Sequence, residues 1–264
     1  MIRRVTNEHT AYYGHLFHAQ NILNAEENKG RSIEIYESSQ FNRLMMLDRT
    51  LVTSERDAFA YYEMLVHVIL YAHPNPKRVL FIGNARKLLY HQVLKHSDLQ
   101  QVDHVVLDES IARHYDEWFK TDTIASHFIR RLESVACTDH YDIIVFDLPR
   151  NYSAASCNDM LRRFLPALRS DGLWNMILPH PMFESKRYEE INRLMRQKGN
   201  QFEDYLSYVP TFPGGIALFR IGTNTGIIQT RVTRGVAVET KYFDAMTHEA
   251  AFVLPRYIKE TRSS

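Results

Sequence analysis

KRVLFIGNARKLLYHQVLKHSDLQQVDHVVLD, residues Lys77 to Asp108, is the stretch that decides the fold of this chain. The apolar run from Val79 to Ile82 predicts a buried strand that ends in a turn at Gly83. Apolar side chains at helical spacing follow, and a second apolar strand from Val105 to Leu107 leads to the acid at its end. This order predicts a βαβ unit of a parallel sheet.

A ligand site is expected at the turn of this unit. Parallel sheets bind nucleotides at the helix N-terminus, and an acid after the second strand, here Asp108, reaches the ribose hydroxyls. The turn reads Gly-Asn-Ala-Arg-Lys rather than glycine-rich, which makes close backbone approach harder, and Arg86 and Lys87 add positive charge. The scaffold of a nucleotide site is therefore present without its usual turn chemistry.

The composition narrows the class of protein. The 264 residues, 45% hydrophobic and 24% charged, are enough for a sizeable core. A formal net charge of +1 creates no global field that attracts nucleic acid or an anionic membrane. The N-terminus lacks an apolar signal core, and no apolar run is long enough to span a bilayer. Because the two cysteines and 13 histidines also lack metal-ligand spacing, we expect a cytoplasmic protein without a metal site.

Two regions flank the βαβ unit. Residues 1–53 alternate polar and apolar side chains in short runs with turn signals at Gly30 and Asp48, which predicts a small antiparallel β domain. In residues 54–264 a helix is expected from Ser54, its N-cap, to Tyr71, followed by alternating strands and helices. The predicted fold class is α/β, with the small N-terminal domain preceding a Rossmann-like, doubly wound domain.

A third strand, from Tyr141 to Phe146, ends in Asp147. A polar loop follows it, and the next helix is expected from Met160 to Arg169. Side chains just past the carboxyl end of a central parallel strand are positioned for chemistry. An acid at that place also commonly caps a helix or accepts hydrogen bonds from loop amides, so its position alone leaves both interpretations open.

Several separated motifs resemble the spermidine synthases, the polyamine aminopropyltransferases, along nearly the whole chain. They are LDRTLVTSERDAFAYYEM (47–64), HPNPKRVLFIG (73–83), LLYHQVLKH (88–96), YDIIVFD (141–147), VPTFPGG (209–215) and KYFDAMTHEAAFVLP (241–255). The last of these is unusually specific. The resemblance implies an N-terminal β domain, a Rossmann-like domain of the methyltransferase type and a homodimer.

The resemblance also implies a reaction. An aminopropyl group moves from decarboxylated S-adenosylmethionine, a co-substrate, to the diamine putrescine, giving spermidine and methylthioadenosine without a separate cofactor. Putrescine arrives protonated, with a pKa of roughly 10, so a carboxylate must help to remove a proton before the nitrogen attacks. Asp147 falls at the position of the family's proton acceptor, and Tyr61 falls at that of the tyrosine that assists it. The alternatives are purely structural roles, in which Asp147 caps a helix and Tyr61 packs in the core.

Several groups that hold the two cationic substrates in the family are replaced here. The family's loop aspartate falls at Arg86, and the second aspartate of its DxxDP loop falls at Arg150. The histidine of its YHEM motif falls at Tyr62, which keeps a hydroxyl, and a tyrosine falls at Phe212. The predicted substrate-binding residues are Tyr62, Gly83, Arg86, Asp108 and Arg150.

Charge argues against the family's substrates at two of these positions. Opposite charges 4 Å apart attract by about 4 kcal/mol at an effective dielectric constant of 20, so an exchange of aspartate for arginine produces a repulsion of that order. The expectation that reconciles Arg86 and Arg150 with cationic substrates is that both guanidinium groups extend into solvent. Three hypotheses stay open: a working aminopropyltransferase, a non-catalytic homologue with a structural or partner-binding role, and a protein with an anionic ligand.

Overall fold

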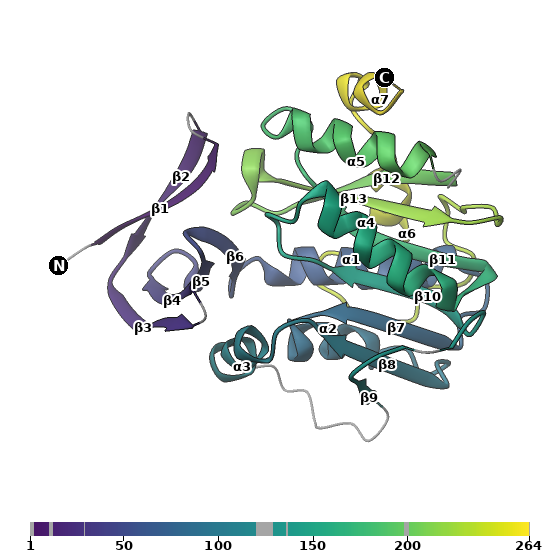
Figure 1. Ribbon diagram of the computed structural model, residues 1–264, viewed down its shortest axis with the longest axis horizontal. Helices are drawn as coiled ribbons and strands as arrows, with labels where there is room; N and C mark the ends of the chain where they lie inside the picture. Colours follow the sequence, from purple (N-terminus) through teal and green to yellow (C-terminus); the bar gives the residue numbers. More distant parts are fainter. Residues whose placement is uncertain are drawn as a thin grey trace.

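The computed structural model describes residues 3–10, 13–28, 30–119, 129–135, 137–197 and 201–263. Its N-terminal part consists of antiparallel strands, as predicted. A two-stranded sheet pairs β1 (Arg3–Thr10) with β2 (Tyr13–Ala19). A four-stranded sheet joins, in order, β3 (Asn21–Asn28), β4 (Arg31–Ser38), β5 (Asn42–Leu47) and β6 (Thr50–Ser54). Figure 1 shows these strands beside the larger part of the molecule.

The larger part is built on a seven-stranded sheet. Its strands, in sheet order, are β12 (Gln201–Tyr208), β13 (Ile216–Thr223), β11 (Leu168–Leu178), β10 (Tyr141–Asp147), β7 (Arg78–Gly83), β8 (Gln101–Val106) and β9 (Ile129–Leu132). The pairs from β11 to β9 are parallel, whereas β12 and β13 are antiparallel. The four central strands are almost fully buried because apolar residues occupy both of their faces.

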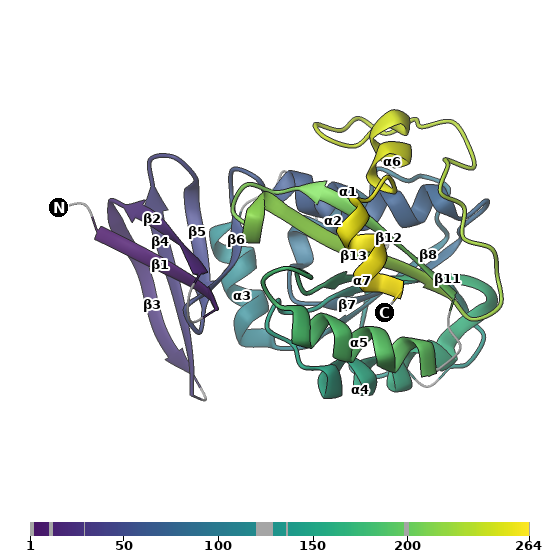
Figure 2. The ribbon, with the colours of Figure 1, turned by 90° about the horizontal axis from the view of Figure 1, so that it is seen from above.

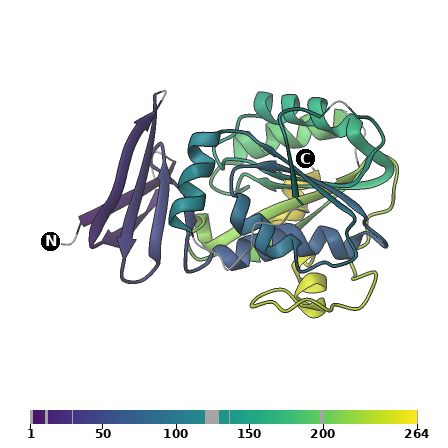
Figure 3. The ribbon, with the colours of Figure 1, turned by 90° about the horizontal axis from the view of Figure 1, so that it is seen from below.

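Helices cover both faces of this sheet, which confirms the predicted α/β class. They are α1 (Ala58–Ala72), α2 (Arg86–Val93), α3 (Glu109–Trp118), α4 (Ala154–Phe164), α5 (Ser185–Gln197), α6 (Ala245–Ala251) and α7 (Arg256–Ser263). Figures 2 and 3 show α1 and α2 on one face and α4 and α5 on the other. Within the part of the chain that the structure describes, no helix is both long and apolar enough to cross a membrane.

Three predicted helix boundaries are wrong. Ser54 is the last residue of β6, where it pairs with Leu44, and the N-cap of α1 is Asp57. The helix expected at 160–169 begins at Ala154, because the hydroxyl of Ser153 accepts a hydrogen bond from the Ser156 amide and caps it. Its end is replaced by β11, which starts at Leu168. The division into domains at residue 53 remains a prediction.

Glu63 connects α1 to the C-terminal segment. Its side chain is buried, and its carboxylate accepts hydrogen bonds from the backbone amides of Lys241, Tyr242 and Phe243 at 3.1, 2.8 and 3.0 Å. A buried carboxylate needs such donors, because an unpaired charge is costly away from water. The segment after β13 is thereby attached to the helix that carries Tyr61.

Candidate active site

The predicted site residues meet at one edge of the sheet because the central strands are parallel. Gly83 ends β7 and Asp147 ends β10, and the two are register partners in neighbouring strands. Asp108 follows β8, the next strand outward. Tyr61 reaches the same edge from the first turn of α1. Residues far apart in sequence are therefore brought to one place by the topology.

Asp147 and Tyr61 form a hydrogen-bonded pair. The Tyr61 hydroxyl donates to Oδ1 of Asp147 at 3.0 Å, and the carboxylate also accepts a hydrogen bond from the Ala85 amide. Burial raises the pKa of Asp147 to about 7, although both hydrogen bonds oppose this shift. Burial and the neighbouring carboxylate also raise the pKa of Tyr61. The aspartate is therefore suited to exchange a proton near neutral pH, while the phenol stays protonated.

A small cavity opens beside this pair. Its volume is about 30 Å³. Of the described residues that line it, Asp147 is the one acid and Arg150 is the one base. The remaining lining residues are Leu47, Val52, Tyr61, Tyr62, Asn84, Ile111, Tyr115, Leu148, Pro149 and Phe212.

A larger cavity of about 820 Å³ lies next to the small one and shares Asn84 and Pro149 with it. Asp108, Ser110, Ser153 and other polar residues line it. Cavities of 300 to 1,000 Å³ accommodate small organic ligands, and this one lies at the carboxyl ends of the strands, where parallel sheets bind nucleotides. The arrangement thus combines a nucleoside-sized cavity with a small cavity that contains the carboxylate.

Asp108 lines the larger cavity and also caps a helix. Its Oδ1 accepts hydrogen bonds from the amides of Ser110 and Ile111 at 2.9 and 3.3 Å, at the start of α3. Asn84 fixes the backbone before it, because its Oδ1 accepts from the Leu107 and Asp108 amides at 3.1 and 2.8 Å. The predicted ribose contact of Asp108 therefore remains a prediction, with one carboxylate oxygen already engaged in the cap.

Gly83 is required by packing. A Cβ atom at this position would lie 2.7 Å from both the Cβ and the backbone oxygen of Asp147. Its backbone φ is not in the left-handed region, so the close approach of two strands, rather than an unusual turn, explains the glycine. Because Gly83 has no side chain, Asp147 can occupy its position beside β7.

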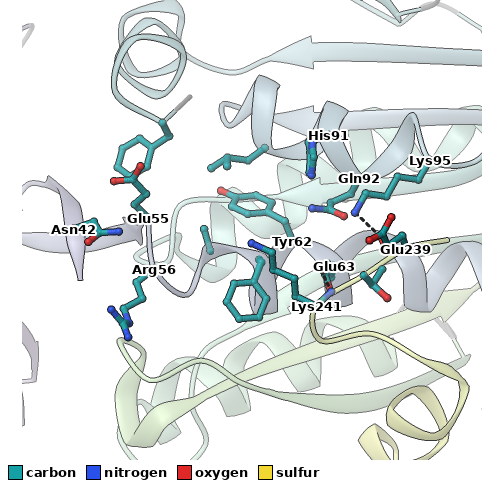
Figure 4. A pocket seen from close by; sticks show the side chains of 15 residues that line it. Asn42, Glu55, Arg56, Tyr62, Glu63, His91, Gln92, Lys95, Glu239 and Lys241 are labelled. Atoms are coloured by element: carbon teal, nitrogen blue, oxygen red, sulfur yellow. Dashed lines mark hydrogen bonds between the residues drawn. The ribbon is translucent and has the colours of Figure 1, made fainter. Parts of the chain in front are cut away.

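Tyr62 separates the small cavity from a third one. This third cavity, of about 680 Å³, lies along α1 and α2 and extends to residues 239–241 (Figure 4). Figure 4 shows Tyr62 between these elements, with Lys241 and Glu63 nearby. Positive and negative side chains alternate around it, so its lining does not favour one sign of ligand charge.

Comparison with known proteins assigns the family. The model of the spermine/spermidine synthase domain matches residues 58–231, about two thirds of the chain. The chain belongs to the spermine/spermidine synthase family. It is 28% identical over 271 residues to the polyamine aminopropyltransferase of Bacillus subtilis strain 168 and 26% identical over 267 residues to that of Shouchella clausii, covering 97% of both chains in each case. The family that the motifs resemble is therefore confirmed.

Solved structures agree on the fold of this spermine/spermidine synthase family member. It covers 95% of a spermidine synthase in complex with the transition-state analogue AdoDATO, with a TM-score of 0.87. It covers 94% of the spermidine synthase from Thermotoga maritima, with a TM-score of 0.86. Both are 20% identical to it in sequence, and each match includes 99% of this chain. The fold is that of the spermidine synthases.

At the first substituted position of this family member, Arg86 is held by two acids of α3. Its guanidinium forms ion pairs with Glu109, at 3.1 Å, and with Asp116, and the side chain is only 13% exposed. It does not line either the small or the larger cavity. The expectation that it extends into solvent is wrong, but its charge is neutralised by α3.

At the second substituted position, Arg150 remains at the cavity. Its guanidinium lies 4.4 Å from the centre of the Phe212 ring and donates a hydrogen bond to the Leu51 carbonyl at 3.2 Å. Burial lowers its pKa to about 10, so it is charged at neutral pH. The expectation of a solvent-directed guanidinium is therefore wrong here too.

Sequence reasoning missed Tyr115 and Asn84, which line the small cavity. Tyr115 lies one turn after Ile111 on α3, and such spacing is usual for a core-facing helix stripe. Nothing in that pattern distinguishes a cavity-lining tyrosine from a packing one. Among the described residues, no group of three or more His, Cys, Asp or Glu side chains is arranged to hold a metal ion.

Proposed function

We propose that this protein transfers the aminopropyl group of decarboxylated S-adenosylmethionine to a primary amine, with the diamine putrescine as the acceptor of the family reaction. The observation that carries the proposal is the hydrogen bond from Tyr61 to Asp147, at the end of a central strand and beside a nucleoside-sized cavity. The family assignment and the curated polyamine aminopropyltransferases support it.

Asp147 acts as the proton acceptor in this proposal. Asp147 first takes a proton from the protonated amine. The neutral nitrogen then attacks the methylene carbon beside the sulfonium sulfur, and a carbon–nitrogen bond forms. The carbon–sulfur bond breaks, and its electrons go to sulfur, leaving the neutral thioether methylthioadenosine. The product nitrogen keeps its two hydrogens as a secondary ammonium. The pKa of about 7 allows Asp147 to be ionised before it takes the amine proton and protonated afterwards.

Tyr61 positions the carboxylate. Its hydroxyl occupies one lone pair of Oδ1 and its ring stacks on Phe212, with centroids 5.4 Å apart. A side chain held at both ends keeps the base in one orientation, which raises the fraction of reactive encounters. The co-substrate nucleoside is assigned to the larger cavity, near Asp108. No separate cofactor takes part in this reaction.

The two alternative hypotheses are less well supported. The anionic-ligand hypothesis rests on positive charge in the site, and the non-catalytic one rests on the replaced groups of the donor site. The charge of Arg86 is directed to Glu109 and Asp116 instead. The charge of Arg150 remains, and it is expected to weaken acceptor binding rather than to remove the base. The predicted homodimer and the cytoplasmic location are also kept as proposals.

A transfer assay tests the proposal. The purified protein is incubated with decarboxylated S-adenosylmethionine and putrescine, and methylthioadenosine and spermidine are separated by chromatography. We expect the two products in equal amounts, and their loss in Asp147→Asn, which keeps the shape but removes the basic oxygen. A wild-type protein that forms neither product, while binding methylthioadenosine, would exclude this reaction and favour a non-catalytic role.

A further inference from the structure

Four aromatic side chains surround the small cavity: Tyr61, Tyr62, Tyr115 and Phe212, here called the aromatic cage. Tyr61 meets Tyr62 edge to face, with centroids 4.8 Å apart and an interplanar angle of 81°. On its other side Tyr61 stacks on Phe212. The phenols of Tyr62 and Tyr115 hydrogen bond to each other, which joins α1 to α3 across the cavity. The rings are therefore fixed relative to one another.

The negative charge at the cage comes from Asp147, while the positive charge of Arg150 lies over the Phe212 ring. The Asp147 carboxylate contributes to raising the pKa of Tyr61, Tyr62 and Tyr115, in addition to burial, so its negative charge reaches all three phenols. Each phenol therefore stays neutral and presents an oxygen lone pair. Aromatic faces attract cations through their quadrupoles, most strongly where water is excluded.

The size of the cage also limits its occupant. A volume of about 30 Å³ holds roughly two water-sized groups, since one such group needs about 10 to 15 Å³. An ammonium head with its neighbouring methylene fits this space, whereas a nucleoside does not. The nucleoside-sized cavity adjoins the cage at Asn84 and Pro149, so a ligand with a nucleoside and a short cationic arm spans both.

The cage contains one carboxylate, whereas the proposed reaction brings two cations, the donor and the protonated amine, to Asp147. Among the described residues that line it, Asp147 is the only acid, and it is needed as the base. Arg150 lies over Phe212, so that ring already faces a cation and leaves the Tyr62 and Tyr115 side for a ligand. The other cation must therefore be held by neutral groups.

We propose that Tyr115, together with Tyr62, is a specificity-determining residue that holds the cationic aminopropyl arm of the donor by aromatic faces and phenol oxygens, in place of a carboxylate. This inference rests on the proposed aminopropyl transfer. The nucleoside then occupies the larger cavity, and the arm enters the cage beside Asp147. Tyr115 discriminates between a nucleoside that bears a cationic arm and one that does not.

Titration calorimetry with two probes tests this role. Decarboxylated S-adenosylmethionine carries the cationic arm, and methylthioadenosine is the neutral nucleoside without it. In Tyr115→Ala we expect the Kd of the cationic probe to rise about 3- to 30-fold, the range of a buried cation–aromatic contact, while the Kd of the neutral probe changes less than about 3-fold. In Tyr115→Phe, which keeps the ring, we expect a smaller rise.

Controls separate this role from a structural one. Tyr257→Ala, on α7, removes a ring that does not line the cage and should leave both affinities unchanged. Tyr115→Leu replaces the alanine variant if the latter does not fold. Equal changes for both probes, or no change for either, overturn the inference. If the wild-type protein binds only methylthioadenosine, cation binding by the cage is excluded and nucleoside binding in the larger cavity is supported. If it binds neither probe, the proposed function is excluded as well.

Discussion

The hydroxyl of Tyr61 lies 3.0 Å from Oδ1 of Asp147, although the two residues are 86 positions apart in the chain. α1 brings the phenol to the carboxyl end of β10, where the carboxylate is buried enough to have a pKa of about 7. Buried strands, an exposed polar ligand site and a tuned acid thus occur within a few ångströms of one another. The proposed reaction depends on this pair.

The activity should rise with pH through the pKa of Asp147. The base must be ionised to accept a proton, so kcat/KM should increase towards a plateau as the pH rises through about 7. Asp147→Asn should lower kcat by roughly 10² to 10⁴, the usual contribution of a general base. Initial rates of methylthioadenosine formation between pH 5.5 and 9 measure both effects. A profile that is flat across pH 7 would contradict the assignment.

Removal of the same charge should stabilise the fold. The folded pKa of Asp147 is about 7 and its ordinary value is 3.8, so ionising the buried carboxyl costs stability as the pH rises between these values. Asp147→Asn should therefore gain roughly 2 to 3 kcal/mol more unfolding free energy at pH 8 than at pH 5. Urea unfolding of both proteins at the two pH values measures this difference. An equal effect at both values would mean that the carboxyl is not buried in this way.

Gly83→Ala should disturb the base without touching the substrate cavities directly. The added Cβ would approach Asp147 to 2.7 Å, so the strand ends or the carboxylate must move. Displacements of about 1 Å in an active site cost on the order of 100-fold in rate, and we expect a loss of kcat of that size. Gly235→Ala is the matched control, because a Cβ there meets no atom within 4 Å. Similar rates for the two variants would refute the packing argument.

Arg86→Asp should destabilise the protein rather than restore the family's site. Its guanidinium pairs with Glu109 and Asp116, and a third acid beside them would repel both. We expect a loss of about 2 to 4 kcal/mol of unfolding free energy, with no tighter binding of the cationic donor. Arg113→Asp, at a more exposed ion pair with Glu26, should cost less than about 1 kcal/mol. Tighter donor binding by Arg86→Asp would show that position 86 still faces the cavity.

Arg150→Gln should strengthen binding of the amine acceptor. The substitution removes a buried positive charge from the cavity lining while keeping a polar side chain for the Leu51 carbonyl. A cation nearby then meets less repulsion, and the KM for putrescine should fall about 10-fold. Arg162→Gln, at a 77% exposed side chain on α4, is the control and should leave KM unchanged. An unchanged or higher KM in Arg150→Gln would show that this charge does not oppose the acceptor.

The fold could be predicted from the sequence because its central strands are continuous apolar runs. The strand from Tyr141 and the βαβ unit after Lys77 are unambiguous in pattern, and the structure confirms them. The second strand of that unit, expected from Val105 to Leu107, begins earlier, at Gln101. The start of α4 could not be predicted, because its first turn, Ala154 to Cys157, consists of small residues and has no large apolar side chain to set a helical period. Ser54 has the chemistry of an N-cap, but pairing with Leu44 in the sheet prevails.

The site was predictable only in part, because the local sequence pattern does not determine where a side chain points. Asp147 and Tyr61 are brought together as their motif positions suggest, and their catalytic roles remain predictions. The direction of Arg86 depends on acids of α3 that lie more than 20 positions away. Tyr115 resembles any apolar helix residue until the fold places it opposite Tyr62.

The buried carboxylate of Glu63 makes the C-terminal segment a remote determinant of the site. Residues 241–243 supply its hydrogen-bond donors and contribute no side chain to the small cavity beside Asp147. Cleavage or shortening of the chain before this segment would leave the acid without partners inside α1, two positions from Tyr61. Proteolytic cleavage there would therefore change the position of Tyr61 relative to Asp147. Two preparations of the protein can be compared only if the C-terminal segment is intact in both.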